Sequence, residues 1–346
     1  MGSKSVISLD AMSGDRGAEI VVRAAKATLD KYSKVELILV GDEAEIAGHV
    51  TRIVGEEKRL SIRNATQVVG MSESPVEALR KKKDSSMRVA IDVVKDGTAQ
   101  ACVSAGNTGA LMATSKFVLK MLPGVDRPAI IAELPAIGGT VHMLDLGANT
   151  VSTAEQLFQF AVMGSIVTAD ISNIERPRVA LLNIGVEDIK GNDMVRDGAA
   201  LLNASGLNYV GFIEGNEIFS GKADVVVTDG FTGNIALKTT EGTAKMVAYF
   251  LKQALIGSLM AKLGALLARP ALNQLRMRMD PRRYNGAMLV GLNGICVKSH
   301  GSTDELGFAN AIGVAANLVT GEFNERIKED MGGINIDQSS NEVAES

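Results

Sequence analysis

Short apolar runs alternate with polar, glycine-containing loops and with segments of helical periodicity along most of the chain. The apolar runs predict buried strands at residues 6–9, 35–40, 60–64, 101–104, 141–146, 179–183, 209–213, 225–227 and 288–297. Helical periodicity predicts helices at residues 18–29, 43–54, 110–121, 154–169, 192–202, 239–268 and 304–319. This β-loop-α order predicts an α/β protein with a parallel central sheet and helices on both faces.

The length of the chain, 346 residues, fits one large α/β domain or two lobes. Apolar residues make up 46% of the sequence, which is enough for a sizeable core, but aromatic residues make up only 4%. The core is therefore expected to consist of Ala, Val, Leu, Ile and Met. We predict one domain over residues 4–331, built as a single unit or as two interwoven lobes, and a disordered polar tail at residues 332–346.

Charge and motif content weigh against several classes of function. The net charge of −4 gives no support to nucleic-acid binding. The two cysteines, Cys102 and Cys296, are far apart in sequence, and the three histidines form no His-x-x-x-His pair. The sequence therefore predicts neither a metal site nor a disulfide, and it favours a reducing cytoplasm. No Gly-x-Gly-x-x-Gly fingerprint follows the first strand, so we expect no nicotinamide or other cofactor.

Three polar loops follow predicted strands and lead into predicted helices. The segments that contain a strand, its loop and the start of the helix are residues 101–110, 179–192 and 222–238. Such loops place backbone N–H groups and the positive end of a helix at the carboxyl edge of a sheet, which suits an anion such as phosphate. Because ligands of open α/β sheets gather outside these strand ends, we expect the loops to meet in one cleft. Each loop alone would also serve as an ordinary turn.

The residue types in these loops suit one kind of reaction. Amides, neutral hydroxyl groups and a lysine fit a nucleophile that is already anionic, such as inorganic phosphate, which needs positioning more than deprotonation. If phosphate attacks a thioester carbonyl, a tetrahedral oxyanion forms. Lys190 or the amide of Asn234 would stabilise that oxyanion.

Two segments of unusual charge each admit two interpretations. Four consecutive cations, Arg80, Lys81, Lys82 and Lys83, form either a solvated helix end or an electropositive arm for an anion or an acidic protein. Residues 243–279 contain no acidic residue. They predict either a core helix pair that turns near Pro270 or a cationic amphipathic surface for a membrane or a partner helix.

Several loop motifs occur together, in one order and at characteristic intervals. They are Asp10-Ala-Met-Ser-Gly-Asp15, Arg80-Lys-Lys-Lys-Asp-Ser-Ser-Met87, Ser104-Ala-Gly-Asn-Thr-Gly-Ala110, Asp145-Leu-Gly-Ala-Asn149, Lys190-Gly-Asn192 and Thr228-Asp-Gly-Phe-Thr-Gly-Asn234. With them the chain closely resembles, over roughly residues 4–330, the bacterial acyl-acyl-carrier-protein:phosphate acyltransferases, the PlsX family of phospholipid synthesis. The resemblance implies an αβα fold similar to phosphotransacetylases and to isocitrate and isopropylmalate dehydrogenases. It also implies transfer of a fatty acyl group from acyl carrier protein to inorganic phosphate.

The resemblance also implies roles for individual residues. Lys190 and Asn234 become the catalytic candidates, with Lys190 on phosphate or the oxyanion and Asn234 on the carbonyl. The remaining candidates for substrate or phosphate binding are Asp10, Ser104, Gly106, Asn107, Thr108, Gly109, Asp145, Asn149, Asp229, Thr232, Gly233 and His300. Helix capping is the alternative role of Asn107 and Asn234.

Partners follow from the same resemblance. They are acyl carrier protein, inorganic phosphate, a second copy of the chain, and a downstream glycerol-3-phosphate acyltransferase that consumes the acyl phosphate. A helical hairpin at about residues 243–283 is expected to attach the protein peripherally to the inner face of the cell membrane. The candidates for contact with the membrane or the carrier are Arg80, Lys81, Lys82, Lys83, Lys252, Lys262, Leu263, Leu266 and Arg269.

Two positions depart from the family pattern. Ser13 stands where the family has Gly, and Ile189 stands where relatives carry a lysine, so the identity of the acting lysine is open. Two other functions stay open on the same sequence. One is a metal- and NAD-dependent β-decarboxylating dehydrogenase of the same fold, and the other is a non-enzymatic protein that binds lipid or carrier.

Overall fold

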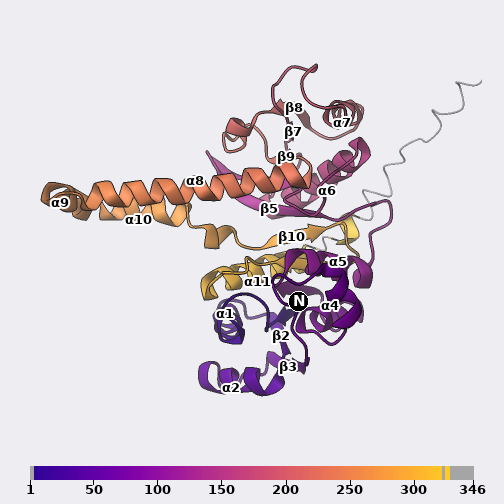
Figure 1. Ribbon diagram of the computed structural model, residues 1–346, viewed down its shortest axis with the longest axis vertical. Coiled ribbons are helices and arrows are strands. Elements are labelled where there is room, and N and C mark those ends of the chain that lie inside the picture. Colours follow the sequence, from indigo (N-terminus) through magenta and orange to yellow (C-terminus); the bar gives the residue numbers. More distant parts are fainter. Residues whose placement is uncertain (1–3, 322–323, 328–346) are drawn as a thin grey trace, which may run out of the picture.

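All predicted strands belong to one mixed sheet in the computed structural model, which describes residues 4–321 and 324–327 (Figure 1). The 11-stranded sheet has the order β3-β2-β1-β4-β11-β10-β5-β6-β9-β7-β8. Its strands are β1 (Ser5–Asp10), β2 (Val35–Gly41), β3 (Leu60–Asn64), β4 (Ala101–Ser104), β5 (Ala129–Ala136), β6 (Gly139–Leu144), β7 (Val179–Leu182), β8 (Tyr209–Ile213), β9 (Val225–Val227), β10 (Ala287–Val290) and β11 (Ile295–Lys298). The chain builds β1 to β4, crosses to β5 to β9, and returns through β10 and β11.

Helices cover both faces of this sheet. They are α1 (Ala18–Lys31), α2 (Glu43–Ile53), α3 (Pro75–Lys81), α4 (Ser86–Lys95), α5 (Thr108–Leu119), α6 (Ala154–Ser172), α7 (Asp193–Asn203), α8 (Gly230–Ile256), α9 (Leu259–Leu267), α10 (Arg269–Arg278) and α11 (Glu305–Thr320). Short 3-10 turns lie at η1 (Gly215–Glu217) and η2 (Pro281–Tyr284). The α/β class that the sequence predicts is confirmed.

Two apolar cores lie on opposite faces of the sheet, because side chains alternate along each strand. Val103 and Val297 belong to one core with α1, α6, α7 and α11. Cys102 and Cys296 belong to the other, with α4, α5 and the start of α8. The two cysteines are neighbours in register on β4 and β11, and both are buried and free.

The two halves of the sheet run in opposite directions. β1, β2, β3, β4 and β11 are parallel to one another. β10 is antiparallel to both β11 and β5, and β5 is antiparallel to β6. β6, β9, β7 and β8 are again mutually parallel, so they run against the first set. The carboxyl ends of β1, β4 and β11 therefore lie at one edge of the sheet, and those of β6, β9 and β7 lie at the opposite edge.

The sequence pattern misses or misplaces several elements. Strand β5 is absent from the prediction because Pro128 and Pro135 flank and interrupt its apolar run. The predicted strand at 288–297 is two strands, β10 and β11, separated by a turn at Gly291 with a φ of 89°. The helix predicted from residue 239 begins earlier, at Gly230, and breaks at Gly257, where α9 bends away from α8 by 113°.

The segment from α8 to α10 projects from the body of the molecule (Figure 1). No residue of α9 or α10 is buried, and the buried residues of α8 are Gly230 and Gly233 at its start. The prediction of a core helix pair near Pro270 is therefore wrong. No single helix among the described residues is long and apolar enough to cross a membrane, and among them only the bent pair α8 and α9 reaches that length and composition together.

Candidate functional site

We call the edge of the sheet at which β1, β4 and β11 end the first edge, and the opposite edge the second edge. A row of polar side chains crosses these three neighbouring strands at the first edge. Asp10 ends β1, Ser104 ends β4 and Lys298 ends β11, with Lys298 paired in register to Ser104. Ser104 Oγ donates to Asp10 Oδ2 at 2.6 Å, and Ser13 Oγ donates to the same oxygen. The row lies on the face covered by α4 and α5, because Cys102 and Cys296, two residues earlier on the same strands, belong to that core.

Asp10 is completely buried in this row. Burial raises the pKa of Asp10, against the lowering effect of the hydroxyl groups of Ser104 and Ser13. Its other oxygen, Oδ1, has no hydrogen-bond partner among the described residues. A carboxyl group in this position cannot touch a ligand directly, but its charge acts on the neighbouring side chains.

The amino end of α5 lies above Ser104. Asn107 caps the helix, because its Oδ1 accepts from the N–H of Ala110 at 3.1 Å. Its Nδ2 donates to the carbonyls of Met71 and Glu73, each at 2.9 Å. The side chain of Asn107 is thus fully used by the cap and by these two carbonyls. The backbone N–H groups of Asn107, Thr108 and Gly109 have no partner among the described residues, and they are free to bind an anion.

Close packing holds this loop in place. A Cβ on Gly106 would lie 2.5 Å from the Met87 side chain and 2.9 Å from Ser13 Oγ. The N–H of Gly106 donates to Ser104 Oγ at 3.1 Å. A larger residue here would force the Met87 and Ser13 side chains to move, so Gly106 suits the close packing of this loop.

His300 and Lys298 lie on a segment that runs beside the same loop. Ser299 N–H donates to the Ser104 carbonyl at 2.9 Å. Asn285 fixes the segment, since its Nδ2 donates to Ser299 Oγ at 2.8 Å and its Oδ1 accepts from the N–H of His300 at 2.9 Å. His300 is exposed, and its Nδ1 accepts from the N–H of Ser302 at 3.2 Å.

The second edge is organised by Asp145, which follows β6. Its Oδ1 accepts from the N–H groups of Ile130, Gly147 and Ala148, and its Oδ2 accepts from the N–H of Asn149 at 2.7 Å. Burial raises the pKa of Asp145, although these hydrogen bonds lower it. Asn149 Nδ2 also bonds this carboxylate and the Pro128 carbonyl. Asp145 and Asn149 therefore hold the loop through these hydrogen bonds.

The start of α8 packs tightly on that loop. A Cβ on Gly233 would overlap the carbonyl oxygen of Asp145, and one on Gly230 would meet Asn149. Asp229 caps the helix by accepting from the N–H of Thr232 at 3.0 Å, and Thr232 Oγ1 donates to the same side chain at 2.7 Å. The polar groups of Asp229 and Thr232 therefore hydrogen-bond to one another.

Asn234 is placed by this packing and keeps its side chain free. It is partly buried beside Gly147, and its amide has no hydrogen-bond partner among the described residues. An oriented amide with unused donors can bind a carbonyl or an oxyanion. The alternative role of Asn234 as a helix cap is wrong, because α8 begins at Gly230 and Asp229 caps it.

Lys190 lies at the same edge as Asn234, on the loop after β7. Asn183 Nδ2 donates to the Lys190 carbonyl at 3.2 Å, and the N–H of Lys190 donates to the Glu187 carbonyl at 2.9 Å. The ammonium group is exposed and has no ion pair among the described residues. Gly191, with a φ of 91°, packs against Asn183 and ends the loop.

The structure thus divides the predicted site into two groups. The first-edge group holds Asp10, Ser104, Gly106, Asn107, Thr108, Gly109 and His300. The second-edge group holds Asp145, Asn149, Lys190, Asp229, Thr232, Gly233 and Asn234. The expectation that all the loops share one edge is wrong for a single chain, because β5 and β10 reverse the strand direction between the groups. Sequence reasoning assigned no role to Lys298, although it precedes His300 in the same motif.

The basic run ends α3, next to the first-edge group. Lys81 pairs with Glu77 and Lys82 pairs with Glu73, whose carbonyl accepts from Asn107. Arg80 and Lys83 are exposed and have no ion pair in the described part of the chain. Two of the four cations therefore support local structure, and two are available to a partner.

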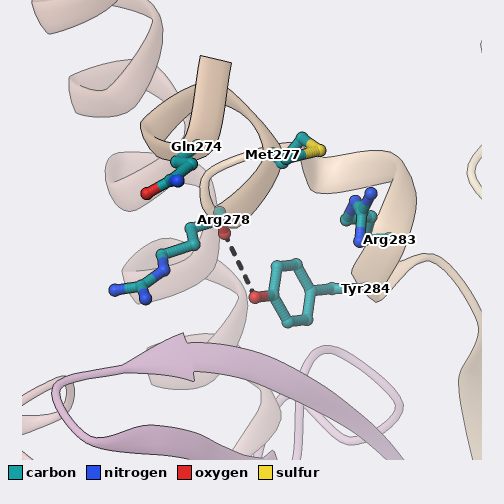
Figure 2. A pocket seen from close by; sticks show the side chains of 5 residues that line it. All are labelled: Gln274, Met277, Arg278, Arg283 and Tyr284. Atoms are coloured by element: carbon teal, nitrogen blue, oxygen red, sulfur yellow. Dashed lines mark hydrogen bonds between the residues drawn. The ribbon is translucent and has the colours of Figure 1, made fainter. Parts of the chain in front are cut away.

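The projecting helices expose many apolar side chains, including Leu263, Leu266 and Leu267. A hollow of about 290 Å³ lies at their base. Figure 2 shows the side chains that line it, which are Gln274, Met277, Arg278, Arg283 and Tyr284. The Tyr284 hydroxyl donates to the Arg278 carbonyl there at 3.1 Å. No member of the first-edge or second-edge group lines this hollow.

Comparison with solved structures defines the class of fold. The chain is similar to a phosphotransacetylase from Streptococcus pyogenes, with a TM-score of 0.60 and 18% identity over 91% of this chain and 94% of that one. It is also similar to a phosphotransacetylase from Staphylococcus aureus, with a TM-score of 0.58 and 17% identity over 91% and 94% of the two chains. The predicted likeness of fold to phosphotransacetylases is confirmed.

Sequence comparison then places the chain in a family. Residues 5–326 match the family described as fatty acid synthesis protein, and the chain belongs to that family. It is 53% identical over 330 residues to the phosphate acyltransferase of Methylococcus capsulatus, covering 94% of this chain and 97% of the relative. It is 52% identical over 317 residues to that of Halorhodospira halophila, covering 91% and 92%. The predicted family is thus confirmed.

Proposed function

We propose that this protein is a phosphate acyltransferase that moves a fatty acyl group from acyl carrier protein to inorganic phosphate. Its relatives at more than 50% identity carry the name phosphate acyltransferase, and they support this activity over a dehydrogenase. The observation that carries the proposal is that three backbone N–H groups at the amino end of α5 have no internal partner. They suit an acceptor that is a small anion.

The reaction proposed is an acyl transfer between a thioester and phosphate. A phosphate oxygen forms the new bond to the carbonyl carbon, the carbon–sulfur bond breaks, and the carrier thiolate leaves and takes a proton from solvent. Phosphate is already charged, so the protein needs to position it more than to deprotonate it. Lys190 and Asn234 have no internal side-chain partner, and we assign them to the developing oxyanion and the carbonyl.

A second copy of the chain is part of this proposal. The first-edge and second-edge groups lie at opposite edges of one sheet, and one reaction needs both. In a twofold dimer, each edge of one copy can face the other edge of its partner. Exposed apolar residues on the second-edge loops, Ile184, Val186, Ile189 and Phe231, support a contact surface there.

Release of the free carrier thiol tests the activity. With an acyl-carrier thioester, the wild-type protein is expected to release thiol in proportion to added inorganic phosphate and to form one acyl phosphate per thiol. Sulfate is the control, because it matches phosphate in shape but is a far poorer nucleophile. Thiol release that does not depend on phosphate would contradict the proposal and favour hydrolysis or simple binding.

We also propose that the α8–α10 projection attaches the protein peripherally to the inner face of the cell membrane. Leu259, Met260 and Leu267 are each more than three-quarters exposed, and Lys252, Lys262 and Arg269 accompany them without any acidic residue. Exposed apolar side chains with flanking cations suit an anionic bilayer surface. The product, an apolar chain with a phosphate head, would pass there to a glycerol-3-phosphate acyltransferase.

Replacing Leu263 and Leu266 together by Glu is expected to reduce co-sedimentation with anionic phospholipid vesicles at least about tenfold, because two apolar contacts are lost and two negative charges are added. The matched control replaces two exposed apolar residues elsewhere, Ile137 and Val210, by Glu. Equal vesicle binding by both double variants would contradict the membrane assignment.

The cations Arg80 and Lys83 are proposed to contact the acyl carrier protein, together with Lys81 and Lys82. Acyl carrier protein is the acidic partner that the activity requires, and α3 lies next to the first-edge group through the bonds of Asn107 to Met71 and Glu73. Charge complementarity of this kind mainly raises the rate of association.

A further inference from the structure

The ammonium group of Lys298 forms no ion pair that would explain its presence in the fold, as far as the described residues show. It is partly buried, and no carboxylate lies within ion-pair distance of it in the described part of the chain. Its Nζ donates only to the carbonyl of the next residue, Ser299. Other shielded lysines of this protein are paired, as Lys82 is with Glu73 at 2.6 Å. The charges of Asp10 and Asp15 act on this ammonium group only from beyond ion-pair distance. A shielded cation without a direct partner is costly, so its retention indicates an anionic ligand.

The surroundings of Lys298 define the kind of ligand. Lys298 is paired in register with Ser104, and the segments that follow them run side by side, joined by the 2.9 Å bond from Ser299 to Ser104. The Ser104 segment leads directly to the free N–H groups of Asn107, Thr108 and Gly109. An ammonium group, three free N–H groups and the positive end of a 12-residue helix together suit a small anion with several oxygens.

Asp10 adds a buried negative charge to the same row of side chains. It is fully buried two strands away in the same row, and its Oδ1 has no hydrogen-bond partner among the described residues. Ser13 and Ser104 both donate to its Oδ2, and its charge acts on Lys298 in the same row. Burial lowers the pKa of Lys298 to about 8, and the charge of Asp10 opposes that shift and keeps the ammonium group protonated at neutral pH.

We infer that Lys298 binds inorganic phosphate, together with the free backbone N–H groups at the start of α5, and that Asp10 acts through Lys298 as a positioning residue. This inference rests on the proposed function and adds a residue to it. It places the phosphate acceptor at the first edge of the sheet.

Kinetics of two variants test the inference. Lys298→Met removes the charge and keeps an unbranched side chain. A charge-assisted hydrogen bond to phosphate is worth about 1.5–3 kcal/mol, so the KM for phosphate is expected to rise about 10- to 150-fold. The KM for the acyl donor is expected to change less than about twofold. Lys298→Arg should recover part of the phosphate affinity, and Lys222→Met, which removes a lysine paired with Glu217 elsewhere, should change neither constant.

A binding measurement on the wild-type protein accompanies the kinetics. The amino groups are modified with trinitrobenzenesulfonate with and without saturating inorganic phosphate, and the modified peptides are identified by mass spectrometry. Phosphate is expected to protect Lys298 and not Lys222. Equal modification of Lys298 with and without phosphate, or an unchanged KM for phosphate in a folded Lys298→Met variant, overturns the inference.

The two measurements separate this inference from the proposed function. If the wild-type protein releases no thiol in response to phosphate, the acyltransferase proposal fails, whereas protection of Lys298 still reports phosphate binding. If thiol release depends on phosphate but Lys298 is not protected, the activity stands and the phosphate site lies elsewhere.

Discussion

Replacing either Lys190 or Asn234 by alanine is expected to lower the turnover number at least about 100-fold. Each side chain is proposed to donate to the oxygen that becomes negatively charged in the tetrahedral intermediate, and loss of one such donor costs about 100- to 1,000-fold. Turnover is measured as acyl phosphate formed at saturating phosphate and acyl donor. The KM values should change little, because the lost interaction forms mainly in the transition state.

Stability should not change in these variants. Neither side chain makes a hydrogen bond or ion pair with the described residues, so the thermal midpoint is expected to stay within about 2 °C of the wild-type value. Lys222→Ala and Asn203→Ala are matched controls at exposed positions away from both groups. Wild-type turnover in both the Lys190 and the Asn234 variant would defeat this assignment of the site.

Mixing two impaired variants tests whether two copies build one site. Lys190→Ala and Lys298→Met are combined at limiting phosphate, where both alone are slow. If Lys190 of one copy acts with Lys298 of the partner subunit, half of the mixed dimers' sites are intact, and about a quarter of wild-type activity returns. If both residues act within one chain, mixed dimers stay as slow as their parents.

Local pattern was enough to find most of the strands of this fold, but not their direction. The runs at residues 35–40 and 225–227 are apolar because both faces of their strands are covered, and this holds whichever way a strand runs. Direction depends on β5 and β10, which are antiparallel to their neighbours. Pro128 and Pro135 conceal β5 in the sequence, so the reversal between the two halves could not be predicted from it.

Residue type alone also could not separate ligand contacts from internal supports. Asn107, Asp229 and Asp145 have the side chains expected of a polar site, and the same oxygens serve equally well to cap a helix or hold a loop. The distinction appears only when each donor and acceptor is accounted for. That accounting leaves the α5 amides and the side chains of Lys190 and Asn234 without a hydrogen-bond partner in the described structure, and it leaves Lys298 with only the carbonyl of Ser299.

Gly233→Ala, at the start of α8, is expected to lower both the stability of the protein and its turnover number, because Gly233 packs on the 145–149 loop and precedes Asn234. The added methyl group would overlap the carbonyl oxygen of Asp145, which is backbone and cannot rotate away. The helix must then move from the 145–149 loop, and we expect a loss of about 3 kcal/mol in the free energy of unfolding. Asn234 is the next residue, and a shift of about 1 Å in its amide would lower turnover about 100-fold.

Gly242→Ala is the matched control for this change. Gly242 lies on the same helix, and a Cβ there would meet no atom within 4 Å. Alanine at that position should stabilise the protein by about 0.4–1 kcal/mol, since it restricts the unfolded chain and favours the helix, and turnover should be unchanged. Both variants are compared by urea unfolding and by acyl phosphate formation. A Gly233→Ala protein as stable and as active as the Gly242→Ala protein would show that the loop after β6 does not position Asn234.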